Sequence, residues 1–318
     1  MNDPSSTLVF GASGFLGAHV AAQAVKLARE EATFADPLGP AVFGTARKPD
    51  AAPSFCEPRD AVGWVETDLA REGSPLAVLE STSPGQVILC AALSRVGDCS
   101  ADPALADRMN RGVPAEVAEW CQRSGARFVH VSTDMVFGGA DAPSGGLLEG
   151  NPVAPLNVYG ESKAAGERAV LEACPEALVV RLPLLYGNSA GRGLGASDSL
   201  LESVASESVP TLFTDEWRTP LEVSNAAAAL VELLGTEASG ILHVAGPDRV
   251  SRYELALAVL GAMGLPPSEA SAMIAGEVSE GAAQGTRPRD VSLDITRACA
   301  VLETELLGVR MGTERAVR

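Results

Sequence analysis

The sequence predicts an α/β protein with a doubly wound parallel sheet and a smaller C-terminal lobe. Short apolar runs alternate with helical stretches over the first 186 residues, and the first run stops at a glycine-rich turn. Several runs are apolar throughout, which is typical of parallel strands covered on both faces. A chain of 318 residues with 46% hydrophobic residues can bury the core that such a sheet requires.

The alternation sets the expected order of elements. We expect strands at residues 7–10, 41–45, 64–67, 86–92, 127–131 and 178–182, and helices at 18–31 and 104–124. Strands that alternate with helices form βαβ units, and right-handed crossovers between them give the doubly wound arrangement. Residues 33–40 are too long for a tight connection and are predicted to form a surface loop.

The regular alternation weakens after about Tyr186. We therefore predict a first domain over residues 1–186, to which residues 222–246 return with one more strand at 240–245. Residues 187–221 and 247–318 are predicted to form the smaller lobe, including a glycine-rich start at 187–195 and a helix at 253–263. The glycine-rich stretch 138–150 is predicted to be a loop within the first domain.

Composition excludes several classes of function. The net charge of −17 repels nucleic-acid phosphates, so we expect no nucleic-acid partner. The chain shows no signal peptide and no apolar run that could span a bilayer, which predicts a soluble cytoplasmic protein without a membrane role. Six cysteines without a CxxC pair and three histidines predict reduced thiols and no metal site.

The glycine loop is the most informative motif. Gly11, Gly14 and Gly17 directly follow the first expected strand and open the first helix. Glycine permits the tight turn and lets a pyrophosphate approach the backbone N–H groups, while the helix N-terminus adds positive partial charge. This placement predicts a Rossmann-type dinucleotide site, although glycines are also common at ordinary strand-to-helix turns. The expected cofactor contacts here are Gly11, Ser13, Gly14, Phe15, Leu16 and Gly17.

Residues after the next strands set the cofactor preference. Arg47 and Lys48 follow the second strand, where an acidic residue would bind the ribose 2′-hydroxyl of NAD. Two cations suit the 2′-phosphate, so NADP(H) is predicted, with NAD(H) as the alternative cofactor and a solvated basic pair as the other interpretation. Further cofactor contacts are expected from Asp68 and Leu69 at the adenine and from the small Ala91 and Ala92.

Thr133, Tyr159 and Lys163 form the candidate chemical centre. Tyr159 and Lys163 are four residues apart and share one face of a helix, and Thr133 follows the fifth strand. A tyrosine hydroxyl can donate a proton to a carbonyl, but its ordinary pKa is about 10. We expect the Lys163 charge and a nicotinamide to lower that pKa, and Thr133 to orient the carbonyl. The alternative is a half-buried tyrosine beside a surface lysine.

Together these motifs resemble the extended short-chain dehydrogenase/reductase family. The resemblance implies that Thr133, Tyr159 and Lys163 are a catalytic triad and that Tyr159 and Lys163 also contact the cofactor. It further implies that Asn110 supports the cofactor site and that Pro183 packs beside the nicotinamide.

Four stretches within that family resemble the dTDP-4-dehydrorhamnose reductases: residues 131–139, 155–167, 214–220 and 287–294. This implies NADPH-dependent reduction of a 4-keto-6-deoxy sugar nucleotide by a homodimer. Met135 stands where related dehydratases carry a glutamate, which disfavours dehydration because methionine cannot transfer protons. Phe15 departs from the subfamily, which often has glutamine there.

The substrate side is predicted from cations and one aromatic residue. Arg192, Arg218 and Arg287 are candidates to bind the phosphates of a nucleotide sugar, and Trp217 to stack on its base or sugar. Each arginine could instead be an ordinary surface residue. Two other functions stay open: reduction of a small aldehyde or ketone, and a non-catalytic NADP-binding regulatory subunit resembling that of methionine adenosyltransferase.

Overall fold

A computed structural model describes residues 3–31, 41–48, 61–139, 142–206 and 208–317. In this part of the chain the main sheet has seven parallel strands in the order β11-β6-β5-β4-β1-β2-β3. These strands are β1 Asp3–Phe10, β2 Val42–Ala46, β3 Val62–Glu66, β4 Pro84–Leu89, β5 Arg127–Thr133, β6 Leu178–Leu182 and β11 Gly240–His243. The predicted doubly wound parallel sheet is therefore confirmed.

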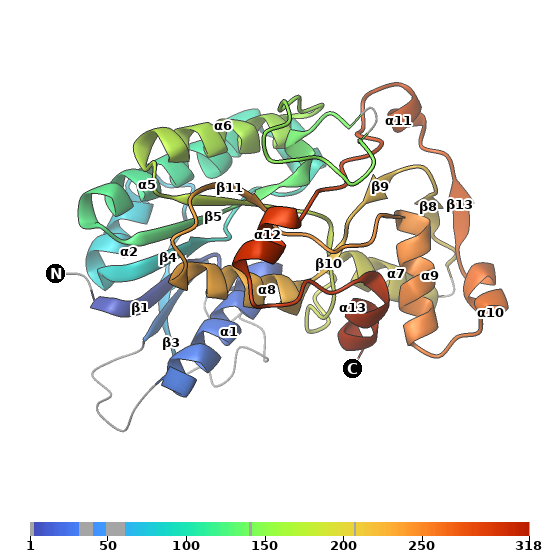
Figure 1. Ribbon diagram of the computed structural model, residues 1–318, viewed down its shortest axis with the longest axis horizontal. Coiled ribbons are helices and arrows are strands. Elements are labelled where there is room, and N and C mark those ends of the chain that lie inside the picture. The colour runs from blue at the N-terminus through green and yellow to red at the C-terminus, as the bar shows by residue number, and fades with distance from the viewer. Residues whose placement is uncertain (1–2, 32–40, 49–60, 140–141, 207, 318) are drawn as a thin grey trace.

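Helices cover both faces of the sheet (Figure 1). One face carries α2 Ser74–Thr82, α5 Val113–Ser124 and α6 Val158–Ala173, whose apolar residues share a core with Phe10 and Phe128. The other face carries α1 Phe15–Glu31, α8 Val223–Glu232 and α12 Thr296–Val301. Burial of both faces explains why the strands are apolar at nearly every position.

A smaller layer lies beyond the carboxyl ends of the strands, at the right of Figure 1. Its helices are α7 Ala196–Ala205, α9 Arg252–Ala262, α10 Pro267–Ala272 and α11 Glu280–Ala283. Its short strands pair as β8 Thr211–Phe213 with β13 Ala275–Glu277, and β9 Trp217–Arg218 with β12 Val250–Ser251. Apolar residues of α7, α9 and α10 form a separate small core.

The remaining elements pack partly on the smaller layer and partly on the main sheet. Strand β7 Leu185–Tyr186 pairs with β10 Leu221–Glu222, and α13 Val309–Ala316 packs against α9. Ala298 of α12 and the following Leu302 and Leu306 are buried in the sheet core, although the sequence assigns them to the lobe. No helix in the described ranges is long and apolar enough to cross a membrane.

The helix expected over 104–124 is confirmed, since residues 103–124 are helical without interruption, but it contains a π-helical turn that the sequence did not predict. Short helices α3 Val96–Ala101 and α4 Pro103–Asp107 precede a π-helical turn, η4 Arg108–Gly112, and only then does α5 begin. Pro114 lacks the N–H that would bond the carbonyl of Asn110, and Val113 N–H instead reaches Arg108 O. The surface loop predicted at residues 33–40 lies outside the described residues.

A buried ion pair fixes α6 to the sheet. Arg181 of β6 donates from Nε to Glu167 Oε1 at 2.9 Å and from Nη2 to Oε2 at 2.7 Å. Ser132 Oγ of β5 adds a bond to Glu167 Oε1 at 2.5 Å. Both charged side chains are almost fully buried, so neither tolerates the loss of its partner.

Gly166 lets α6 pack directly on η4. A Cβ at Gly166 would lie 2.0 Å from Asn110 O, a backbone atom that cannot swing aside. We expect Gly166→Ala to lower the free energy of unfolding by about 1–3 kcal/mol through overpacking. The matched control is Gly261→Ala on α9, where nothing stands in the way; it should raise stability by about 0.5–1 kcal/mol through helix propensity. Urea unfolding of the two variants measures both effects, and equal midpoints would contradict this packing constraint.

Candidate active site

A cavity of about 640 Å³ lies at the carboxyl ends of the parallel strands. This edge is where ligands bind in doubly wound folds. Its wall brings together most of the predicted cofactor residues: Gly11, Ser13, Gly14, Phe15, Leu16, Arg47, Asp68, Leu69, Ala91, Ala92, Tyr159, Lys163 and Pro183. Thr133 also lines it. Three predicted cofactor residues, Gly17, Lys48 and Asn110, are not part of this wall.

The glycine loop is shaped by close backbone contacts. Gly11 adopts a φ of 80°, and a Cβ there would lie 2.8 Å from Ala91 N. A Cβ on Gly17 would lie 2.1 Å from Gly11 O. The Gly11 N–H donates to Thr45 Oγ1 at 2.9 Å, which ties the loop to the end of β2. Gly17 therefore shapes the loop from behind, while Gly11 and Gly14 lie at the cavity.

Arg47 and Lys48 leave the end of β2 as exposed side chains. Arg47 reaches the cavity wall, whereas Lys48 lies beyond it. On this geometry Arg47 is the better placed of the two to meet a 2′-phosphate at the mouth of the cavity.

Arg108 holds the wall on the β3 side and was missed from the sequence. Its guanidinium donates to the carbonyl oxygens of Leu69 at 3.2 Å, Ala70 at 3.3 Å and Arg71 at 3.0 Å. Glu116 pairs with the same guanidinium. Since these carbonyls lie 37 to 39 residues away along the chain, no local motif marks the contact.

Asn110 supports the cavity from behind its wall. Its Oδ1 accepts from Leu93 N, and its Nδ2 donates to Leu93 O and Ser162 Oγ, each at 2.9 Å. The side chain is fully buried. Leu93 itself lines the cavity, so Asn110 acts on the wall through this neighbour.

The structure brings Thr133, Tyr159 and Lys163 together. Thr133 ends β5, and Tyr159 and Lys163 face the cavity from the first turns of α6, whose N-terminus is capped by Asn157. The Thr133 hydroxyl lies close enough to Tyr159 to lower the pKa of its phenol. Lys163 Nζ donates to Val131 O at 2.6 Å and lies 3.5 Å from His130 Nε2.

The direction of the Tyr159 pKa differs from the sequence expectation. Burial raises the pKa of Tyr159 above its ordinary value, and the nearby Asp134 carboxylate adds to that, while the Thr133 hydroxyl opposes it. Burial outweighs the attraction that the Lys163 ammonium, which donates to Val131 O, exerts on a Tyr159 phenolate. The protein's own groups therefore keep Tyr159 protonated at neutral pH, which suits a proton donor.

Lys163 is itself perturbed. Burial lowers the pKa of Lys163 to about 8, against the opposing effects of Glu167 and Cys90. Cys90 follows β4 at the cavity wall, and burial raises the pKa of its thiol to about 12. The thiol is therefore neutral, and Lys163 is mostly charged at neutral pH.

Arg218 supports the chemical centre from a buried position and does not stand at the cavity surface. Its Nε lies 3.8 Å from Asp134 Oδ2, and it donates to Trp217 O at 2.6 Å and Pro288 O at 3.1 Å. Asp134 Oδ1 in turn accepts from Thr133 Oγ1 at 3.0 Å. Burial raises the pKa of Asp134, and Arg218 opposes that shift. A chain of contacts thus links Arg218 through Asp134 to Thr133.

The other predicted substrate residues occupy two separate places. Arg287 binds buried Glu216 through two bonds of 2.6 and 3.0 Å, and its guanidinium carbon lies 5.0 Å from the centre of the Phe213 ring. Trp217 has Arg249 stacked 4.1 Å from its ring centre. Arg192, in contrast, binds carbonyls of the glycine loop.

Arg252 is a further cation that the sequence reasoning missed. It opens α9, and its Nε lies 3.8 Å from Glu216 Oε2. Burial and the neighbouring charges of Arg218 and Arg287 lower the pKa of Arg252. Arg218, Arg252 and Arg287 therefore lie around two carboxylates, Asp134 and Glu216.

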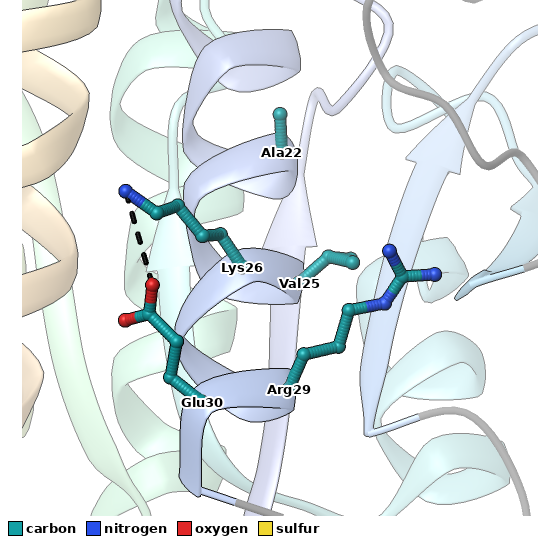
Figure 2. Close-up of a pocket in the computed structure, with 5 residues that line it drawn as sticks. All are labelled: Ala22, Val25, Lys26, Arg29 and Glu30. Carbon is teal, nitrogen blue, oxygen red and sulfur yellow. Dashed lines mark ion pairs between the residues drawn. The ribbon is translucent and has the colours of Figure 1, made fainter.

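A second hollow lies along α1 and is lined, among the described residues, by Ala22, Val25, Lys26, Arg29 and Glu30 (Figure 2). Figure 2 shows Lys26 reaching toward Glu30, with 3.9 Å between Nζ and Oε1. Exposed pairs of this kind contribute little binding energy. Within the described ranges no group of three or more His, Cys, Asp or Glu side chains could hold a metal ion.

A family model described as the RmlD substrate binding domain matches residues 5–318. The chain belongs to this family. It is 31% identical over 290 residues to a probable low-salt glycan biosynthesis reductase of Haloferax volcanii, covering 91% of this chain and 89% of the relative. It is 32% identical over 268 residues to a dTDP-4-dehydrorhamnose reductase of Mycobacterium tuberculosis, covering 82% of this chain and 76% of the relative.

Two other similarities bear on the alternatives. The RmlD-family chain is 30% identical over 240 residues to the methionine adenosyltransferase 2 subunit beta of Rattus norvegicus, covering 73% of this chain and 68% of that one. A crystal structure of dTDP-4-dehydrorhamnose reductase from Bacillus anthracis in complex with NADP has the same fold, with a TM-score of 0.75, 21% identity and 98% of each chain covered.

The Lys163 pKa yields a pH prediction. The ammonium is charged below about pH 8 and neutral above it, so its support for negative charge on Tyr159 is lost as the pH rises. We expect kcat/KM for a carbonyl substrate that takes its proton from Tyr159 to fall above about pH 8. A pH series of kcat/KM measures this. Lys163→Arg keeps its charge and should lack the fall at this pH. A wild-type profile that stays flat to pH 10 would contradict the assignment.

Proposed function

We propose that this chain is an NADPH-dependent reductase of a 4-keto-6-deoxy sugar nucleotide, similar in activity to the dTDP-4-dehydrorhamnose reductases. The observation that carries the proposal is the single cavity that joins the glycine loop to Thr133, Tyr159 and Lys163. Its relatives named as reductases support this assignment.

The cavity residues fit a dinucleotide. Gly11 and Gly17 have no room for a Cβ, so the loop keeps the tight turn that brings the start of α1, the positive end of the helix, to a pyrophosphate. The small side chains of Ala91 and Ala92 in the cavity wall leave space beside it. Arg47 at the cavity edge favours NADP(H), with NAD(H) as the weaker cofactor.

The proposed chemistry divides between cofactor and protein. NADPH, when bound, supplies a hydride to the carbonyl carbon. Tyr159 donates its proton to the carbonyl oxygen, and Thr133 orients that oxygen by a hydrogen bond. Lys163⁺ stabilises the negative charge left on Tyr159. Met135 occupies the position after Asp134 and has no ionisable group, which agrees with reduction and not with elimination.

The arginines around Glu216 are the proposed site for the substrate diphosphate. Arg252 and Arg287 are partly exposed and lie beside the buried Arg218. Guanidinium groups bind phosphate oxygens through paired hydrogen bonds, so these two partly exposed cations suit a diphosphate. We assign Arg218 to holding Asp134 and Thr133 in place, and Arg252 and Arg287 to the phosphates.

A non-catalytic NADP-binding regulatory subunit is the second candidate, favoured by the relative of that name. Such a subunit requires no proton donor, whereas this cavity places Tyr159 against Thr133 and beside a charged lysine. A reductase of small aldehydes would need no diphosphate site. We further propose a cytoplasmic location and, on the resemblance alone, a homodimer.

The deciding experiment is an NADPH oxidation assay against nucleotide-linked 4-keto sugars and simple aldehydes, repeated with NADH. We expect turnover with the sugar nucleotides and a preference for NADPH. Tyr159→Phe should lose about 10²–10⁴-fold in kcat, because general-acid catalysis contributes that much. The variant should still bind NADPH. Wild-type protein that binds NADPH without turning over any carbonyl substrate would favour the regulatory candidate.

Arg287 offers a test of the substrate side. Replacement by alanine removes one diphosphate partner and should raise KM for the sugar nucleotide about tenfold, equal to about 1.4 kcal/mol, with little change in KM for NADPH. Arg310→Ala is the matched control, because Arg310 is highly exposed on α13 and pairs only with Glu314 among the described ion pairs. An unchanged sugar-nucleotide KM in Arg287→Ala would remove Arg287 from the site.

A further inference from the structure

Residues 187–195 form a strap that joins β7 to α7 and lies against the glycine loop. The strap and the loop are about 180 residues apart in sequence, yet Arg192 Nη1 donates to Ser13 O at 2.5 Å and its Nη2 to Gly14 O at 3.4 Å. The same guanidinium donates from Nε to Ser189 O at 3.1 Å within the strap. Arg192 therefore connects the strap to the segment that opens α1.

Two further contacts hold the strap independently of Arg192. His19, one turn into α1, bonds through Nε2 with Asn188 O at 2.8 Å. The Phe15 ring packs against Gly195, where a Cβ would lie 2.8 Å from Phe15 Cζ. Leu194 lines the cavity opposite the loop. The strap is thus both attached to α1 and part of the cavity wall.

The N-terminus of α1 is the positive end of a helix dipole, and the Arg192 guanidinium lies beside it on the carbonyls of Ser13 and Gly14. An anion on the N–H groups of the loop would be stabilised by the helix end and by Arg192 together. The pyrophosphate of a dinucleotide is such an anion.

We propose that Arg192 and the strap retain the cofactor, Arg192 by holding the glycine loop in its binding shape and by adding positive charge beside the pyrophosphate. This inference rests on the proposed NADP(H) site and moves Arg192 from the substrate phosphates to the cofactor. Phe15, the residue at which the loop departs from the dTDP-4-dehydrorhamnose reductases, gives the strap its apolar contact.

Direct binding of NADPH tests the proposal without requiring turnover. NADPH fluorescence titration gives Kd, and stopped-flow displacement by excess NADP⁺ gives the release rate. Arg192→Ala should raise Kd about tenfold or more and speed release, while Arg192→Lys, which keeps the charge but not the forked geometry, should fall between. Arg310→Ala serves as the surface-arginine control and should match the wild type.

His19 supplies a second, independent variant. His19→Ala removes the bond with Asn188 O and should speed NADPH release, whereas His19→Gln can still donate to that oxygen and should release at a rate nearer the wild type. Circular dichroism checks that each variant is folded. Unchanged Kd and release in both Arg192→Ala and His19→Ala would overturn the proposal, as would a rise confined to the sugar-nucleotide KM. Failure of the wild type to bind NADPH would instead refute the proposed function.

Discussion

The buried ion pair between Glu167 and Arg181 is the interaction on which the candidate site depends. It joins α6, which carries Tyr159 and Lys163, to β5 and β6, which carry Thr133 and Pro183 at or just beyond their ends. Loss of one partner would leave an unpaired charge in the core, a cost of several kcal/mol. The separation between the hydroxyls of Tyr159 and Thr133 is therefore set by a contact deep within the sheet.

The smaller C-terminal layer also contacts this site, through a single arginine. Arg218 comes from β9 in that layer, and its contact with Asp134 spans the boundary between the layer and the sheet. Thr133 thus hydrogen-bonds to a carboxylate whose charge depends on a residue 84 positions later in the chain. The proposed catalytic residues and the arginines of the smaller layer are thus linked through one carboxylate, Asp134.

Sequence reasoning located the parts of the site that are local in the chain. The glycine loop and the Tyr159–Lys163 pair are recognisable because their function depends on spacing within one element. The sequence indicated Arg192 and Arg218 as candidate site residues but not their positions, since the groups that they contact lie far away in the sequence. No sequence motif marks Arg108 or Arg252 as part of the site. The π-helical turn could not be predicted either, because the spacing of apolar residues does not show which backbone hydrogen bonds Pro114 removes.

The Asn110 side-chain amide makes the two hydrogen bonds to Leu93 that a neighbouring strand would otherwise make. It satisfies both the N–H and the C=O of Leu93, as an adjacent backbone would, just where β4 has ended. The rim of the cavity at Leu93 is consequently fastened to the helical layer rather than to the sheet. The bond from Asn110 Nδ2 to Ser162 Oγ couples this rim to α6, the helix that also carries Tyr159.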